Sequence, residues 1–215
     1  MKGRRIVLWR HGRTAWNAER RFQGQTDIPL DATGVAQAAR SAHTLAKLSP
    51  HRIVSSDLSR ARATAQALAD VTGLEVAEDA RLRETFAGEW QGLTRTELEA
   101  RFGDELVRWA TGPDVRPGGG ETRREVAARM VAAVERGLSG LDSGQTLVVA
   151  THGGSARAAM GALLGLPADC WAALGVLVNC AWSVLEEGTG PHGPAWRLQE
   201  YNAGSLPVTA LADDR

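Results

Sequence analysis

Two short apolar runs that each end in a histidine and a glycine constrain the fold of this chain most. Residues 6–9 lead into Arg10-His11-Gly12, and residues 146–150 lead into Thr151-His152-Gly153-Gly154. Apolar runs without alternation are typical of strands that helices cover on both faces. Side chains that follow such strands lie at the carboxyl edge of the sheet, where open α/β sheets hold their sites. We therefore expect a functional site at this edge.

The segments between these strands show helical periodicity. We expect helices over residues 33–48, 58–71, 94–102, 122–138 and 155–164, and further strands over residues 52–54, 74–77, 181–185 and 196–201. This alternation predicts a three-layer α/β/α sandwich with a mostly parallel central sheet, and the last two strands predict an antiparallel edge. A length of 215 residues suits a single domain over residues 1–215, with a loose tail after about residue 203.

Composition excludes several classes of partner. Lysine plus arginine and aspartate plus glutamate are equal at 25 each, so the chain has no net charge, which argues against a nucleic-acid or anionic-membrane surface. No run is long enough for a signal peptide or a membrane span, which predicts a cytoplasmic protein. Cys170 and Cys180 lack metal-site spacing and are expected to be reduced thiols.

Arg10 and His11 together suggest phosphoryl chemistry. A neutral imidazole can attack phosphorus through one ring nitrogen when a hydrogen bond to the other nitrogen fixes its tautomer. The planar guanidinium of Arg10 matches the oxygens of a phosphate group. Taken alone, these residues are equally compatible with a solvated histidine in a turn.

Three further motifs favour the catalytic interpretation. They are the run from Ser55 to Arg60 after a second strand, Leu82-Arg83-Glu84 before Gly88-Glu89-Trp90-Gln91-Gly92, and the segment around His152. With Arg10-His11-Gly12 they resemble, in order and over nearly the whole chain, the histidine phosphatase superfamily, which includes the cofactor-dependent phosphoglycerate mutases. The resemblance implies a phosphoglycerate mutase-like fold and a phosphohistidine formed on His11.

The resemblance also implies catalytic roles for other residues. Arg10 and Arg60 would hold the phosphoryl oxygens, and His152 would donate a hydrogen bond to them. Glu84 would protonate the leaving group and then activate water, with Glu89 as its rival.

The substrate-binding residues implied are Asn17, Gln23, Gly24 and Gly153. Trp90 either lines the mouth of the site or packs in the core. No cofactor is implied. Nor is a metal, because no clustered aspartate, glutamate and histidine set has ligand spacing.

Three functions remain open at this point. A phosphomonoesterase is favoured over a mutase, because Thr85 and Ala87 stand where mutases carry an arginine and a tyrosine that grip a second anion. A non-catalytic phospholigand-binding protein is the third. Residues 82–94, 179–182 and 196–203 are similar to the actinobacterial glucosyl-3-phosphoglycerate phosphatases, while α-ribazole and broad-specificity phosphatases share the same motifs. We expect a small phosphorylated metabolite as the ligand and a homodimer as the assembly.

Overall fold

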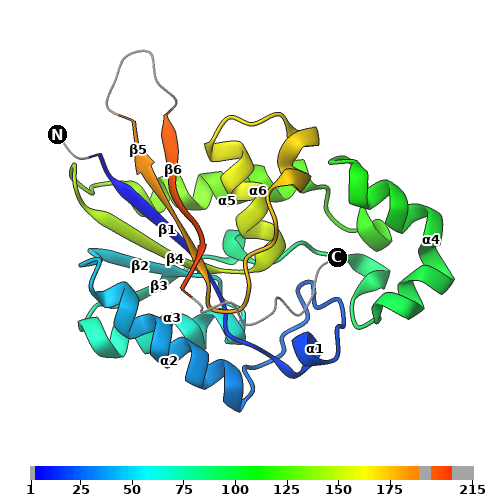
Figure 1. Ribbon diagram of the computed structural model, residues 1–215, viewed down its shortest axis with the longest axis horizontal. Coiled ribbons are helices and arrows are strands. Elements are labelled where there is room, and N and C mark those ends of the chain that lie inside the picture. Colours follow the sequence, from blue (N-terminus) through cyan, green and yellow to red (C-terminus); the bar gives the residue numbers. More distant parts are fainter. Residues whose placement is uncertain (1–2, 189–194, 205–215) are drawn as a thin grey trace.

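The computed structural model describes residues 3–188 and 195–204, which form one sheet between two helical layers (Figure 1). The strands are β1 (Arg5–Arg10), β2 (Arg52–Ser55), β3 (Val76–Glu78), β4 (Thr146–Thr151), β5 (Trp182–Glu187) and β6 (Trp196–Ala203). Their order in the sheet is β3-β2-β4-β1-β5-β6. The first four in this order are parallel, and β5 and β6 add two antiparallel pairings at one edge. The predicted fold class is confirmed.

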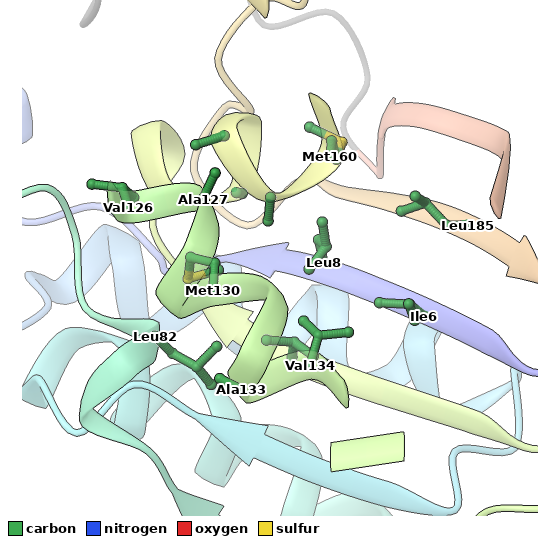
Figure 2. Packing of buried hydrophobic residues seen from close by; sticks show 14 of the residues in the cluster. Ile6, Leu8, Leu82, Val126, Ala127, Met130, Ala133, Val134, Met160 and Leu185 are labelled. Carbon is green, nitrogen blue, oxygen red and sulfur yellow. The ribbon is translucent and has the colours of Figure 1, made fainter. Parts of the chain in front are cut away.

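The helices divide between the two faces of the sheet. Helices α2 (Ala32–Ala46) and α3 (Ser59–Thr72) cover one face, where Val7, Trp9 and Val148 are buried. Helices α5 (Arg123–Leu138) and α6 (Gly153–Leu163) cover the other face, where Ile6, Leu8 and Met130 pack together (Figure 2). Short α1 (Ala15–Ala18), long α4 (Arg95–Thr111) and the 3-10 turns η1 (Ala80–Leu82), η2 (Gly88–Trp90), η3 (Pro117–Gly119) and η4 (Ala168–Ala173) complete the described part.

The chain connections place a crevice at the carboxyl ends of β1 and β4. These two strands are parallel neighbours, with Arg10 beside Thr151 in the register. The chain passes from β1 to helices on one face and from β4 to α6 on the other. Where two neighbouring parallel strands connect to opposite faces of the sheet in this way, a crevice opens at their carboxyl ends. Open α/β sheets bind their ligands at such topological switch points.

The predicted helix bounds agree with the structure to within two residues, except at the end of α4. Helix α4 extends nine residues beyond the predicted end at Phe102, where the backbone departs from helical geometry at φ −135°. It continues because Leu106 and Trp109 pack with Trp90 in a separate small core. Helix α6 starts at Gly153 rather than Ser155, because the carboxylate of Glu84, distant in the sequence, accepts from the N–H groups of Gly154 and Ser155.

Some expectations fall on parts of the chain that the structure does not describe. The tail that we expect to be loose lies, from residue 205 onward, outside the described residues. Among the residues that are described, no helix combines the length and apolar character needed to cross a membrane.

Candidate active site

His11 lies directly after β1 in the crevice, and its side chain is almost completely buried. Its backbone N–H donates to the Thr151 carbonyl at 3.0 Å, which ties the turn to β4. The ring Nδ1 lies 2.7 Å from the carbonyl oxygen of Gly12. A carbonyl can only accept, so Nδ1 carries the proton and Nε2 keeps its lone pair. This tautomer leaves Nε2 available as a nucleophile.

The surroundings of His11 keep the imidazole neutral. Burial, followed by the positive charges of Arg60 and Arg10, lowers the pKa of His11 well below its ordinary value. The neutral form therefore persists at pH values below the ordinary histidine pKa of about 6.5. Only this form can attack phosphorus.

Two arginines from different elements lie beside His11. Arg10 ends β1 and donates from Nη1 to the carbonyl of Leu177 at 2.6 Å. Arg60 lies in the first turn of α3, is fully buried, and donates to the carbonyls of Thr26 and Gly24, each at 2.8 Å. Burial lowers the pKa of Arg60 to about 10, so its guanidinium stays charged at neutral pH.

His152 stands next to His11, with the two ring centroids 5.1 Å apart. Its Nδ1 accepts from Arg60 Nε at 3.2 Å, so its Nε2 carries the proton and faces the Ser56 hydroxyl at 2.9 Å. Both ring nitrogens are thus engaged within the protein. For His152 to donate to a phosphoryl oxygen, as expected from the sequence, its Nε2–H must exchange Ser56 for the ligand.

Glu84 reaches the crevice from the loop after η1 and binds the start of α6. Its two carboxylate oxygens accept from the backbone N–H groups of Gly154 and Ser155 at 2.9 Å each, and from Thr85 at 2.7 Å. The first turn of a helix has unpaired N–H donors and a partial positive charge, which favour a carboxylate. Glu84 therefore caps α6 from 70 residues away and fixes its own position near the two histidines.

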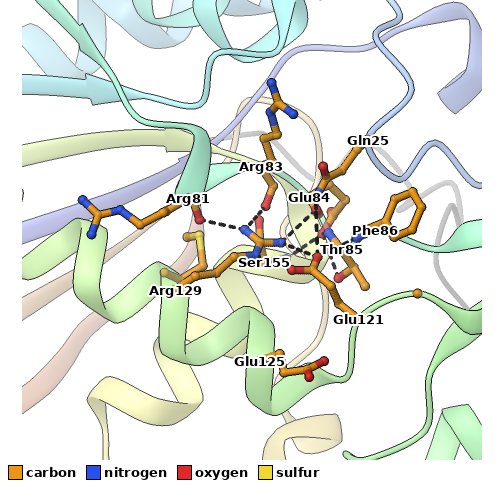
Figure 3. Close-up of polar contacts among 12 residues, drawn as sticks. Gln25, Arg81, Arg83, Glu84, Thr85, Phe86, Glu121, Glu125, Arg129 and Ser155 are labelled. Atoms are coloured by element: carbon orange, nitrogen blue, oxygen red, sulfur yellow. Dashed lines mark hydrogen bonds and ion pairs between the residues drawn. The ribbon is translucent and has the colours of Figure 1, made fainter.

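The backbone that carries Glu84 is held by Arg129 of α5, a residue that the sequence did not single out (Figure 3). Its guanidinium donates to the carbonyls of Arg81, Arg83 and Glu84 at 2.6 to 2.9 Å. Glu121 binds the same guanidinium through both carboxylate oxygens at 2.8 and 2.9 Å. Arg129 is thus a positioning residue for the Glu84 loop.

We expect Arg129→Met to lower kcat for an alkyl phosphate by at least about tenfold. Loss of the three carbonyl contacts lets the Glu84 loop shift, so proton transfer to a poor leaving group suffers more than turnover of an aryl phosphate. Steady-state kinetics on both esters measure this difference. Arg136→Met is the matched control, because Arg136 lies on the same helix but binds Asp79 instead. Equal losses on the two esters would mean that Arg129 acts on stability alone.

The other predicted residues lie around one pocket of about 290 Å³. Its lining includes Arg10, His11, Asn17, Gln23, Gly24, Arg60 and Glu84. The amide oxygens of Asn17 and Gln23 accept from Thr14, which leaves their amino groups for a ligand. Gly24 has a left-handed φ of +52°, and its carbonyl accepts from Arg60.

Gly153, which is not part of this lining, adjoins the guanidinium of Arg10. A Cβ atom built on Gly153 would lie only 2.4 Å from Val176 Cγ1, so a side chain there has no room.

Two residues left open by the sequence lie away from the pocket. Glu89 is exposed and does not line it. Trp90 is fully buried and packs against Phe22, Phe102 and Trp109, so it belongs to the small core behind the pocket. Within residues 3–188 and 195–204, no group of three or more histidine, cysteine, aspartate or glutamate side chains is placed to hold a metal ion.

Comparison with known proteins identifies the family. The family model described as histidine phosphatase superfamily (branch 1) matches residues 6–203. The chain belongs to the histidine phosphatase superfamily. This assignment confirms the resemblance that the four motifs indicated.

Proteins with different names match most of this chain. The chain is 41% identical to a glucosyl-3-phosphoglycerate phosphatase of Mycolicibacterium vanbaalenii, over 95% of this chain and 97% of the relative. It is 38% identical to a protein of Shigella boydii named a probable phosphoglycerate mutase, over 84% of each chain. A solved mycobacterial glucosyl-3-phosphoglycerate phosphatase, complexed with VO3, superimposes with a TM-score of 0.87 at 41% identity, covering 94% of this chain and all of that one.

Proposed function

We propose that this protein is a phosphomonoester hydrolase that acts through a phosphohistidine on His11, without a metal ion. The main support is a neutral imidazole, with Nδ1 fixed on the Gly12 carbonyl, in a pocket that Arg10 and Arg60 also line. Membership of the histidine phosphatase superfamily supports it.

In the first step, the lone pair of His11 Nε2 attacks phosphorus and the ester P–O bond breaks. Arg10 and Arg60 bind the equatorial oxygens, whose negative charge they stabilise without reorganising. Glu84 in its protonated form gives its proton to the leaving oxygen. The alcohol leaves, and the phosphoryl group stays bonded to Nε2.

In the second step, water attacks the phosphohistidine. Glu84, now a carboxylate, takes a proton from the water, while the P–N bond breaks and its electron pair returns to His11 Nε2. Inorganic phosphate leaves, and Glu84 again holds a proton for the next cycle. Dividing the displacement in two lowers the barrier that a direct attack by water would face.

The substrate in this proposal is a small phosphorylated metabolite such as glucosyl-3-phosphoglycerate, as in the mycobacterial relatives. The alternative, a phosphoglycerate mutase, has support in the Shigella relative. Two positions argue against it. The backbone N–H and the hydroxyl group of Thr85 both contact the Glu84 carboxylate, and Ala87 is fully buried. Neither residue therefore has a free polar group that could bind a second anion.

The nature of the phosphoryl acceptor tests this choice. With 3-phosphoglycerate as substrate, we expect free phosphate to form at least about tenfold faster than 2-phosphoglycerate, because water is the acceptor. Phosphate release and product NMR on the same reaction measure both rates. The release is expected to persist in excess EDTA, since guanidinium groups neutralise the phosphoryl charge. Dominant isomerisation would instead establish the mutase.

Cellular location and assembly complete the proposal. We place the enzyme in the cytoplasm, where small phosphorylated metabolites are found, and expect a homodimer without nucleic-acid or membrane partners. Light scattering of the purified protein at several concentrations tests the dimer.

A further inference from the structure

The outer part of the pocket carries more positive charge than one phosphoryl group requires. Among the described residues that line it there are seven arginines but a single carboxylate, that of Glu84. In the proposed mechanism, Arg10 and Arg60 bind the oxygens of the phosphoryl group. Arg20 is exposed to solvent. Arg21 and Arg95 have their own partners in Glu19 at 2.7 Å and Glu99 at 2.6 Å.

Arg123 and Arg157 lack such partners in the described part of the chain. Arg123, the first residue of α5, donates Nη1 to the Gly112 carbonyl at 3.3 Å and lies over the Trp109 ring at 4.6 Å. Among the residues that the structure describes, its buried Nε–H has no acceptor, and neither does the buried indole N–H of Trp109. Arg157 is half-buried on α6, and no carboxylate among the described residues pairs with it. This corner of the pocket therefore has two buried N–H donors, Arg123 Nε and Trp109 Nε1, that are left for a ligand.

The guanidinium groups of Arg123 and Arg157 belong to residues that line the same pocket. Burial, and then the positive charge of Arg157, lowers the pKa of Arg123 to about 10, so Arg123 stays charged at neutral pH. Two like charges that are partly withdrawn from water raise the free energy of the unliganded protein. An anion bound between them would relieve this cost.

We infer that Arg123 and Arg157 form a second anion subsite, which binds a carboxylate on the leaving group of the phosphomonoester. This inference rests on the proposed function and deepens it by defining the substrate class. The subsite binds the part of the substrate that leaves, so it does not decide whether the phosphoryl group passes to water.

The position of the subsite suits a short carbon skeleton. Arg157 lies one helical turn beyond Gly153 on α6, about 6 Å along the helix axis at 1.5 Å per residue. Gly153 adjoins the Arg10 guanidinium, so the subsite is about one helical turn from the phosphoryl site. A carboxylate separated from the ester oxygen by two carbons, as in a phosphoglycerate, spans such a distance.

The test compares 3-phosphoglycerate with glycerol 3-phosphate, in which an uncharged hydroxymethyl group replaces the carboxylate. We expect the ratio of kcat/KM for these two esters to fall at least about tenfold in Arg157→Met, since a charge-assisted hydrogen bond to the carboxylate is lost. Arg157→Lys keeps the charge and should retain part of the ratio. Arg124→Met is the matched control, because Arg124 is exposed on α5 and pairs with Asp114 at 2.8 Å.

A ratio in Arg157→Met within twofold of that of the unsubstituted protein would overturn the subsite. So would an equal fall in Arg124→Met, which would reveal a general effect of net charge. Thermal unfolding of each variant shows whether it is folded. Hydrolysis of an aryl phosphate by the unsubstituted protein reports on the proposed function separately. If no phosphate is released there, the hydrolase itself is contradicted, whereas normal release with an unchanged ratio contradicts only the subsite.

Discussion

His11→Ala is expected to lower kcat by at least about 10³-fold, which corresponds to about 4 kcal/mol of transition-state stabilisation. The substitution removes the Nε2 lone pair, and His11 is the only histidine among the described residues that line the pocket. Neighbouring His152 cannot replace it, because both of its ring nitrogens are already engaged. Steady-state hydrolysis of an aryl phosphate measures the loss. Trapping the unsubstituted enzyme with labelled substrate should give an acid-labile, base-stable phosphoenzyme that His11→Ala does not form.

The fold should survive this substitution. His11 joins β4 and the segment before β5 through its backbone groups, which donate to Thr151 and accept from Cys180. Alanine keeps both contacts. His43→Ala, at an exposed position on α2, is the control for loss of a histidine away from the pocket. Activity of His11→Ala within about tenfold of the parent would show that the phosphoryl group is not transferred through His11.

The sequence located the site because its key residues lie at ends of buried strands. An apolar run such as residues 6–9 predicts a strand, and the register of a parallel sheet then brings Arg10 beside Thr151 and the following histidines together. The family resemblance supplied Arg60 and Glu84, which lie on a helix and a loop where periodicity indicates no function. All of these side chains meet around the crevice, while their chemical roles stay predictions.

The supporting contacts were not predictable in this way. Arg129 has the helical spacing of a solvated arginine in the sequence, yet it binds three carbonyls of the Glu84 loop. The start of α6 was misplaced for a related reason: Gly153 and Gly154 have low helix propensity, and the cap that compensates comes from Glu84. Contacts between segments so far apart leave no local pattern.

Glu84→Gln is expected to slow the phosphorylation of His11 by esters with poor leaving groups much more than by esters with good leaving groups. An alkoxide, such as a sugar or glycerate oxygen, leaves poorly without a proton, whereas a nitrophenolate needs little help. Glutamine keeps the shape of the side chain and one carbonyl oxygen for the N–H donors of α6, but it has no acidic proton. We expect phosphorylation of His11 by the alkyl ester to slow by about 10² to 10⁴, and phosphorylation by the aryl ester to change little.

Single-turnover phosphorylation of Glu84→Gln by both esters is therefore the decisive comparison, because it isolates the step in which the proton is given. Hydrolysis of the phosphoenzyme should slow as well, since the same carboxylate takes the proton from water, so the aryl ester should show a burst followed by slow turnover. Glu89→Gln is the matched control, because Glu89 is exposed and outside the pocket lining. Equal losses for the two esters in Glu84→Gln would remove Glu84 from the acid role, and a selective loss in Glu89→Gln would give that role to Glu89.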